Sequence, residues 1–133
     1  MRRALLGVVA ALVLVAAGTY LAGEQTEVVV LRTRDAAGAA HDTKMWIVDA
    51  LGSPFVRVAN PQRDWYQRLL AEPRVELVRG DRSFAMTAQP EEAPAVREAV
   101  DAAFTAKYGL VDAWYGLLLR RSPVPVRLVP EQP

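Results

Sequence analysis

The chain has 133 residues, enough for one folded domain, and its 16 Lys and Arg nearly balance its 15 Asp and Glu. A net charge of +1 lacks the basic patch typical of nucleic-acid-binding proteins, so no nucleic-acid partner is predicted. The absence of cysteine excludes disulfides and Cys-ligated zinc or iron–sulfur sites. A single histidine leaves no multi-His metal site, and no metal is predicted.

Residues 1–23 are typical of a membrane anchor. Arg2 and Arg3 precede an uncharged run over residues 4–23, which as a helix is about 30 Å long and matches the hydrocarbon core of a bilayer. We therefore predict a single-pass transmembrane anchor, a tether over residues 24–27, a cytoplasmic N-terminus and an extracytoplasmic domain. The alternative is a signal peptide cleaved after a small-residue site at residues 16–18.

The rest of the chain, residues 28–133, predicts a domain of mixed strands and helices. Gly80-Asp81 is typical of a two-residue type II′ hairpin turn. Apolar residues with helical spacing between Val96 and Phe104 indicate a core-facing helix. Pro125 confines the last strand to an edge or to one free side. The predicted strands cover residues 28–34, 43–48, 55–59, 75–79, 82–88 and 123–129, and the predicted helices cover residues 62–71, 93–108 and 112–121.

These elements predict an α+β fold, a small and mainly antiparallel barrel of about six strands with two to three helices packed outside. The strands are short and mostly joined by hairpins, without the strict strand–helix alternation of a doubly wound fold. A Gly- and Ala-rich loop over residues 35–42 follows the first strand and contains His41. A solvated loop histidine is the preferred interpretation of His41, and Trp114 is assigned to the core or an interface.

The best candidate site lies between Thr43 and Arg68. Asn60 suits a helix N-cap and Pro61 the first helical position, and a helix start favours an anion through its N–H groups and dipole. Cations and aromatic rings surround this point in sequence and predict a pocket for a flat anionic ligand. They are Lys44, Arg57, Arg63, Arg68, Trp46, Trp65 and Tyr66. The alternative places the cations on solvated faces and the rings in the core.

Several segments resemble the FMN-binding split-barrel superfamily and, within it, the nitroreductase/quinone reductase branch, whose better-known members use a deazaflavin. The resemblance covers residues 28–129. It rests on Thr43-Lys44-Met45-Trp46-Ile47-Val48, on Trp65-Tyr66-Gln67-Arg68-Leu69 with Pro73-Arg74-Val75-Glu76-Leu77, and on Pro125-Val126-Arg127-Leu128.

The resemblance implies a split barrel that binds FMN or a deazaflavin and forms a homodimer. It places the cofactor phosphate near Thr43, Lys44 and the backbone of Ala59-Asn60-Pro61, and the ring system between Trp46 and Trp65. Arg57, Arg63 and Arg68 are added to this set because of their charge. The catalytic residues stay unassigned.

Two functions are consistent with the sequence. The first is a membrane-anchored protein that binds a flavin-like or quinone-like ligand and acts as a nitroreductase or quinone reductase, with the cofactor supplying the redox chemistry. The alternative is a non-enzymatic, membrane-tethered barrel that has lost its cofactor and serves as a binding or assembly module. The alternative is favoured by the loop at residues 60–63, which lacks the glycine that deazaflavin users commonly carry there.

Overall fold

The computed structural model describes residues 8–9, 27–109 and 123–131. Apart from residues 8–9, the predicted anchor lies outside the described residues, as do the predicted helix over residues 112–121 and Trp114. None of the helices in the described ranges has the length and apolar character needed to cross a bilayer.

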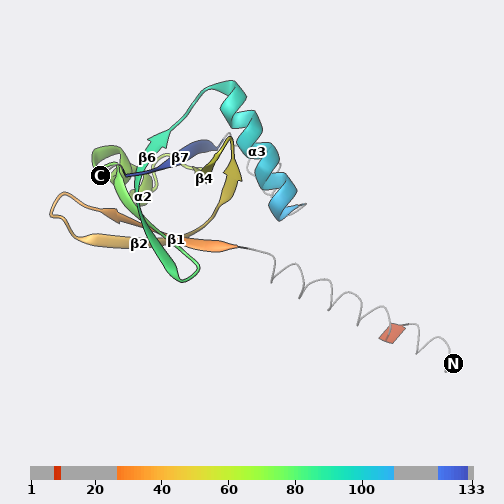
Figure 1. Cartoon of the computed structure of the whole chain (residues 1–133), viewed down its shortest axis with the longest axis horizontal. Coiled ribbons are helices and arrows are strands. Elements are labelled where there is room, and N and C mark those ends of the chain that lie inside the picture. Colours follow the sequence, from red (N-terminus) through yellow and green to blue (C-terminus); the bar gives the residue numbers. More distant parts are fainter. Residues whose placement is uncertain (1–7, 10–26, 110–122, 132–133) are drawn as a thin grey trace.

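Seven strands form one curled, antiparallel sheet, and two helices pack against it (Figure 1). The strand order across the sheet is β2-β1-β5-β6-β7-β4-β3, so the two edges are strands that follow each other in sequence. The strands are β1 (Val28–Arg34), β2 (Ala40–Trp46), β3 (Val48–Ala50), β4 (Ser53–Val58), β5 (Arg74–Arg79), β6 (Arg82–Pro90) and β7 (Val124–Pro130), and the helices are α2 (Asp64–Ala71) and α3 (Pro94–Tyr108).

The main core fills the concave side of the sheet. Alternate residues of β1, namely Val29, Leu31 and Thr33, are buried, because successive side chains of a strand point to opposite faces. Val126 and Leu128 of β7 reach the same core from across the curl. Helix α2 closes this core with one amphipathic side, from which Tyr66 and Leu69 are buried.

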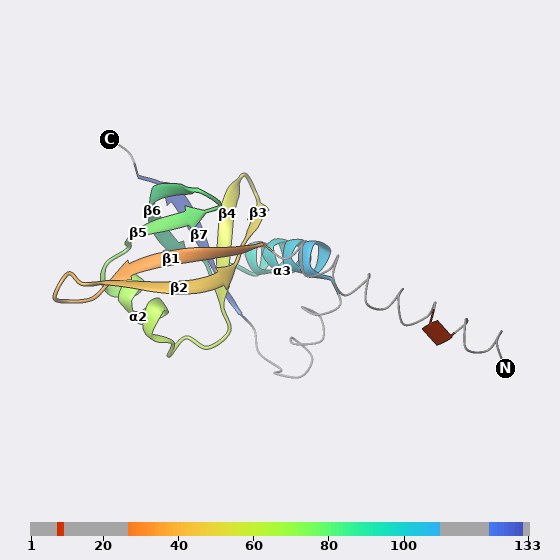
Figure 2. The same ribbon diagram turned by 90° about the horizontal axis from the view of Figure 1, so that it is seen from below.

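A second core lies on the convex side, under α3. Val100, Phe104 and Tyr108 of the helix pack on Val48 of β3 and Phe55 of β4, and all five are buried. Figure 2 shows the resulting arrangement, with α2 beside β1 and β2 and α3 at the other end of the sheet. Helix α3 therefore packs on the convex face at the β3–β4 end of the sheet, where Trp46 at the end of β2 also packs against it.

The single strand predicted over residues 43–48 is wrong, because the chain leaves one edge of the sheet at Trp46 and joins the other at Val48. Ile47 makes this crossing and is fully buried. Its N–H donates to the Tyr108 hydroxyl over 3.0 Å, and its carbonyl accepts from Lys107 over 2.8 Å. The backbone hydrogen bonds of Ile47 are therefore made with α3. In a continuous strand they would have been made with a neighbouring strand.

Two other predicted boundaries are wrong for local reasons. Residues 40–42 belong to β2, where His41 pairs in register with Thr33, so the predicted loop is shorter. Helix α2 begins at Asp64, with Arg63 as the N-cap. The side chain of Asn60 accepts from the N–H of Gln62 over 3.0 Å, so Asn60 closes a turn before the helix and does not cap it.

Strand β7 is internal, between β6 and β4, so of the two predicted positions of Pro125 the edge is excluded and one free side remains. Pro125 is tolerated because β6 ends at Pro90, opposite Val126. The Pro125 carbonyl still accepts from the N–H of Glu91 over 2.9 Å. The nitrogen and the carbonyl of one strand residue face the same neighbouring strand, so the nitrogen of Pro125 is directed toward β6. Because β6 has ended there, the lack of an N–H on Pro125 costs the ladder no hydrogen bond.

The predicted hairpin at Gly80 and the predicted helix over residues 93–108 are confirmed. Arg79 pairs with Arg82 across Gly80, whose φ of 63° suits the predicted tight turn. Helix α3 buries the predicted stripe and ends at Gly109, whose φ of 68° and ψ of −145° lie in a region that favours glycine.

Leu51 generates a stability prediction. It occupies the two-residue turn of the β3–β4 hairpin with a φ of 52°, followed by Gly52 with a φ of 77°. A left-handed conformation costs a leucine about 1 kcal/mol and suits asparagine better. Leu51→Asn should therefore raise the free energy of unfolding by about 1 kcal/mol in urea denaturation followed by tryptophan fluorescence. Gly52→Ala is the matched control and should lower it, while a loss of stability in Leu51→Asn would contradict the assigned turn.

Candidate functional site

Trp46 and Arg57, two predicted site residues, meet in a column of stacked rings under α3. The Trp46 ring lies parallel to the Tyr108 ring, with centroids 4.5 Å apart. Tyr108 stacks on Phe104 at 5.7 Å, and the Arg57 guanidinium caps the Phe104 ring at 3.9 Å. Arg57 also pairs with Asp101 over 2.9 Å. These contacts join β2 and β4 through α3, so both residues contribute to packing.

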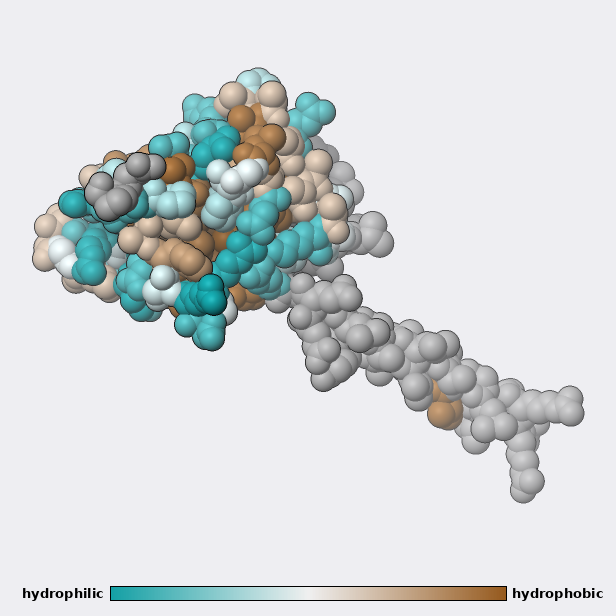
Figure 3. All heavy atoms as spheres, in the orientation of Figure 1, coloured by the Kyte–Doolittle hydropathy of each residue, from teal (hydrophilic) through white to brown (hydrophobic). Residues whose placement is uncertain are grey.

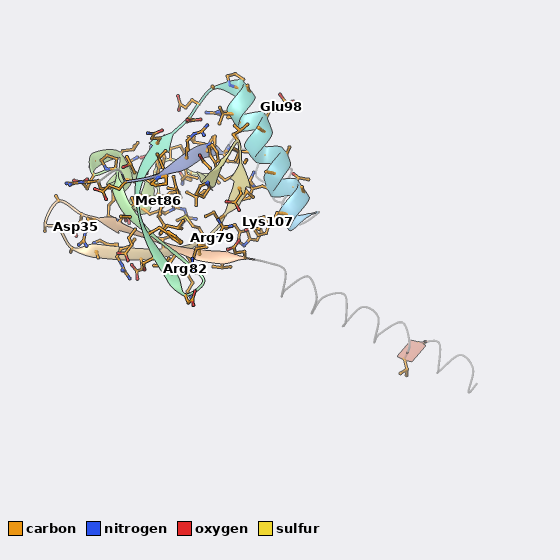
Figure 4. All side chains as sticks on the ribbon, in the orientation of Figure 1. Asp35, Arg79, Arg82, Met86, Glu98 and Lys107 are labelled. Carbon is orange, nitrogen blue, oxygen red and sulfur yellow. The ribbon has the colours of Figure 1, made fainter. Side chains whose placement is uncertain are left out.

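A polar network at the start of β1 fixes the same end of the barrel. The carboxylate of Glu27 accepts from Lys107 over 2.6 Å and from Arg79 over 2.9 and 3.0 Å. Arg79 also bonds Asp49 of β3. The hydrogen bond from Arg79 is the main reason that the pKa of Glu27 lies below its ordinary value. Figure 4 shows Arg79 and Lys107 close together beside the start of β1.

Three predicted residues belong to the concave side, near α2. Trp65 is partly buried and meets Tyr66 edge-on, with ring centroids 6.0 Å apart. The Nε of Arg68 donates over 2.8 Å to the hydroxyl of Thr33, which is fully buried. Thr43 pairs in register with Leu31 and therefore shares its inward face. The sequence did not reveal the partner Thr33, because it lies on another strand.

Lys44 and Arg63 are the exposed cations of the predicted site. Lys44 stands on the convex face opposite Val30, and Arg63 lies at the start of α2. Neither forms an ion pair with any residue that the structure describes, in contrast to Arg57. Both are therefore available to an anion from solution.

The fold brings Lys44 toward the segment that precedes α2. The β3–β4 ladder ends at the pair Val48–Phe55. If its register continued back along the chain, Lys44 would lie opposite Ala59. β2 and β4 do come into contact, without forming a ladder. We call the region formed by Lys44, Ala59, Asn60, Arg63 and Trp65 the β2–α2 mouth.

A cleft of about 910 Å³ lies at the other end of α2, where the tip of the β1–β2 hairpin approaches the start of β5. Of the predicted site residues, only Arg68 lines it. Its other charged lining residues are Arg32, Arg34, Asp35, Glu72, Arg74, Glu76 and Glu131. No pattern in the sequence identified this cleft, because its residues come from four separate segments.

His41 lies near this cleft and contacts Asp35, with 2.8 Å between Nε2 and Oδ2. The other carboxylate oxygen of Asp35 accepts from the N–H groups of Ala37 and Ala39. The hydrogen bond with His41 is the main cause of the lowered pKa of Asp35. The pair is exposed and orders the hairpin loop, with no nucleophilic side chain recorded in contact with it.

The comparisons with known proteins identify a family and a fold. The model of a family described as "Uncharacterized protein conserved in bacteria (DUF2255)" matches residues 21–121. No curated protein matches the chain closely enough to count as a relative.

Solved structures share the fold at low sequence identity. The heme storage protein HutZ of Vibrio cholerae is 17% identical, over 88% of this chain and 90% of that one, with a TM-score of 0.65. An F420-H2 dependent reductase (FDR-A) is 21% identical, over 76% and 93%, with a TM-score of 0.60. A domain-swapped dimer is 20% identical, over 77% and 79%, with a TM-score of 0.65. The chain thus has the split-barrel, FMN-binding-like fold.

The hydroxyl of Tyr108 generates a second stability prediction. It accepts from the N–H of Ile47, and its own hydrogen lies within reach of the carbonyls of Glu27 and Ile47, at 2.9 and 2.7 Å. Tyr108→Phe leaves the buried N–H of Ile47 without this acceptor and should cost about 1–3 kcal/mol in urea denaturation. Tyr66→Phe is the matched control and should cost less, because no hydrogen bond from that hydroxyl to a described residue is seen. Equal costs would contradict the role of Tyr108.

Proposed function

The chain belongs to the DUF2255 family, and from its split-barrel fold we propose that it binds a flat, anionic, flavin-like or quinone-like molecule at the β2–α2 mouth. The observation that carries this proposal is that Lys44 and Arg63 are exposed and form no ion pair within the described residues. Asn60 and Trp65 lie within three positions of Arg63 in the sequence and offer an amide and a ring surface. Cation, ring and amide are the groups that bind a phosphate-bearing aromatic cofactor.

The structural neighbours favour FMN or a deazaflavin as the ligand. One of them is an F420-H2 dependent reductase, and F420 is a deazaflavin. If such a cofactor binds, it would carry the hydride, and the protein would position it and exclude water. We therefore propose that the chain belongs to the nitroreductase/quinone reductase branch. HutZ is a heme storage protein of the same fold, so heme is a useful third ligand to test.

Homodimer formation is part of the proposal. On the convex face of the sheet, Val28 of β1 is 50% exposed. Figure 3 shows apolar spheres emerging in separate patches between polar ones on the face in view. A neighbour of the same fold is a domain-swapped dimer, which supports self-association. Light scattering on the purified full chain should then give twice the mass of one chain.

The ligand proposal is tested by titrating the full chain with FMN, with a deazaflavin and with heme while recording visible spectra. Lys44→Ala should weaken binding of the phosphate-bearing ligand by about 1–3 kcal/mol, which is about 5- to 150-fold, because a charged hydrogen-bond partner is lost. Arg82→Ala removes one positive charge from the β5–β6 turn and should leave the affinity unchanged.

The possible outcomes separate the two functions. Binding that Lys44→Ala weakens and Arg82→Ala does not would support the cofactor site. Absence of binding with every ligand would leave the alternative, a barrel that acts as a binding or assembly module. That alternative is favoured by the engagement of Trp46 and Arg57 within the protein itself.

We also propose that residues 4–23 anchor the protein in a membrane with the domain outside the cytoplasm. The run is uncharged and two arginines precede it, which supports this orientation. A reporter that fluoresces only in the cytoplasm, fused after Pro133, should stay dark while the fusion is found in the membrane fraction. Bright fluorescence, or release of the fusion into the soluble fraction, would contradict the anchor.

A further inference from the structure

We propose that the cleft at the C-terminal end of α2 is a second, separate binding site, which takes a small molecule through a single carboxylate or phosphate group. The cleft lies where β1 and β5 separate, and we call it the β1–β5 fork. Helix α2 has eight residues and is about 12 Å long, so the fork and the β2–α2 mouth are at its two ends.

The fork arises because the pairing of β1 with β5 stops early. The register runs from Val30–Val78 to Arg32–Glu76, whereas β1 continues to Arg34 and β5 begins at Arg74. The next two pairs, Thr33 with Val75 and Arg34 with Arg74, are not formed. The strands separate there. The space between them is lined by the last part of α2, through Arg68 and Ala71, and by Glu72, which follows the helix. A volume of about 910 Å³ is within the range of small-molecule sites.

Backbone groups of Arg34 face into the fork. Asp35 donates its N–H to Ala39 of the β1–β2 hairpin, so odd-numbered residues of β1 bond toward β2. The even-numbered residues therefore bond toward β5, as Arg32 does with Glu76. Arg34 follows the same alternation and has no β5 partner, so its N–H is directed into the cleft. On the opposite wall the N–H of Arg74 is satisfied by the Glu72 carboxylate, over 3.2 Å.

Two arginines of the fork have guanidinium groups without a carboxylate partner among the described residues. Arg68 uses its Nε for the Thr33 hydroxyl, and its two terminal nitrogens have no recorded partner. Arg34 donates from one terminal nitrogen to the carbonyl of Gly38, over 3.0 Å. Guanidinium groups match carboxylates and phosphates with paired hydrogen bonds. Arg34 and Arg68 both line the cleft and keep guanidinium donors without a partner among the described residues, and we call these two side chains the Arg34–Arg68 corner.

The carboxylates that face the fork limit the charge of the ligand. Asp35 is held by His41, Glu72 by Arg74 and Glu76 by Arg32. Glu131 has no side-chain bond to a described residue. The pKa of Arg74 is raised mainly by its hydrogen bond with Glu72, and the charge of Glu131 adds to this. Four arginines and four acidic residues line the cleft, so the total charge does not attract a polyanion. One compact oxyanion at the Arg34–Arg68 corner is the group that fits.

The test is a titration of the full-length, isotope-labelled chain with propionate and, separately, with inorganic phosphate, at constant ionic strength, followed by NMR. Saturable shifts are expected at the amide groups of Arg34 and Gly38 and at the Nε–H of Arg68. Saturation by propionate alone or by phosphate alone identifies which oxyanion the site takes. Shifts that stay linear, or that chloride reproduces, mean that the ion acts only through ionic strength and overturn the proposal.

Variants separate the fork from the general charge of the protein. Arg34→Gln should weaken binding about tenfold, because one charged hydrogen-bond partner is lost. This side chain contacts only an exposed carbonyl, so the variant should fold normally, whereas Arg68→Gln also removes the bond to Thr33. Arg82→Gln is the matched control and should bind as the native chain does. Equal affinities for the Arg34→Gln variant and the control overturn the proposal, whether or not the β2–α2 mouth binds FMN.

Discussion

The barrel depends on one buried crossing, where the chain passes Ile47 between the two edges of the sheet. The backbone N–H and carbonyl of Ile47 are both satisfied by α3, through Tyr108 and Lys107. An unsatisfied buried group costs about 1–3 kcal/mol, so the crossing is stable only while α3 is docked. Because β2 and β3 lie at opposite edges, holding Ile47 also holds the sheet curled. The contact between β2 and β4, and with it the β2–α2 mouth, follows from this constraint.

The charged and aromatic residues fall into two groups, those that attach α3 to the sheet and those that stay exposed. Tyr108 and Phe104 stack with Trp46 and Arg57, so these rings and this cation stabilise the attachment of α3. Lys44, two residues before Trp46 on β2, is exposed and takes no part in that column. Ligand recognition is therefore expected where the fold has not used the side chains, at the mouth and at the fork, and α2 separates the two regions.

The sequence predicted correctly those elements that are determined by neighbouring residues alone. Strand β1 was predicted with its observed bounds, and Gly80 and the apolar stripe of α3 placed a hairpin and a helix. The break at Ile47 could not be predicted, because the residues around it read as one strand and the bonds that break it come from α3, about sixty positions later. The sequence could not decide between the two predicted positions of Pro125 for a related reason, since its tolerance depends on where β6 ends. In the candidate site, Arg57 and Arg68 were grouped with Lys44 and Arg63 because they are close in sequence. In the folded chain they belong to different regions.

The claim that a ligand binds at the β2–α2 mouth is tested most directly by mapping FMN binding onto the backbone. An NMR titration of the full chain reports every amide at once and needs no variant. We expect saturable shifts concentrated at Lys44, Ala59, Asn60 and Arg63, with smaller shifts at the indole of Trp65. Saturable shifts confined to other regions, or no shift at any ligand concentration, would contradict the claim.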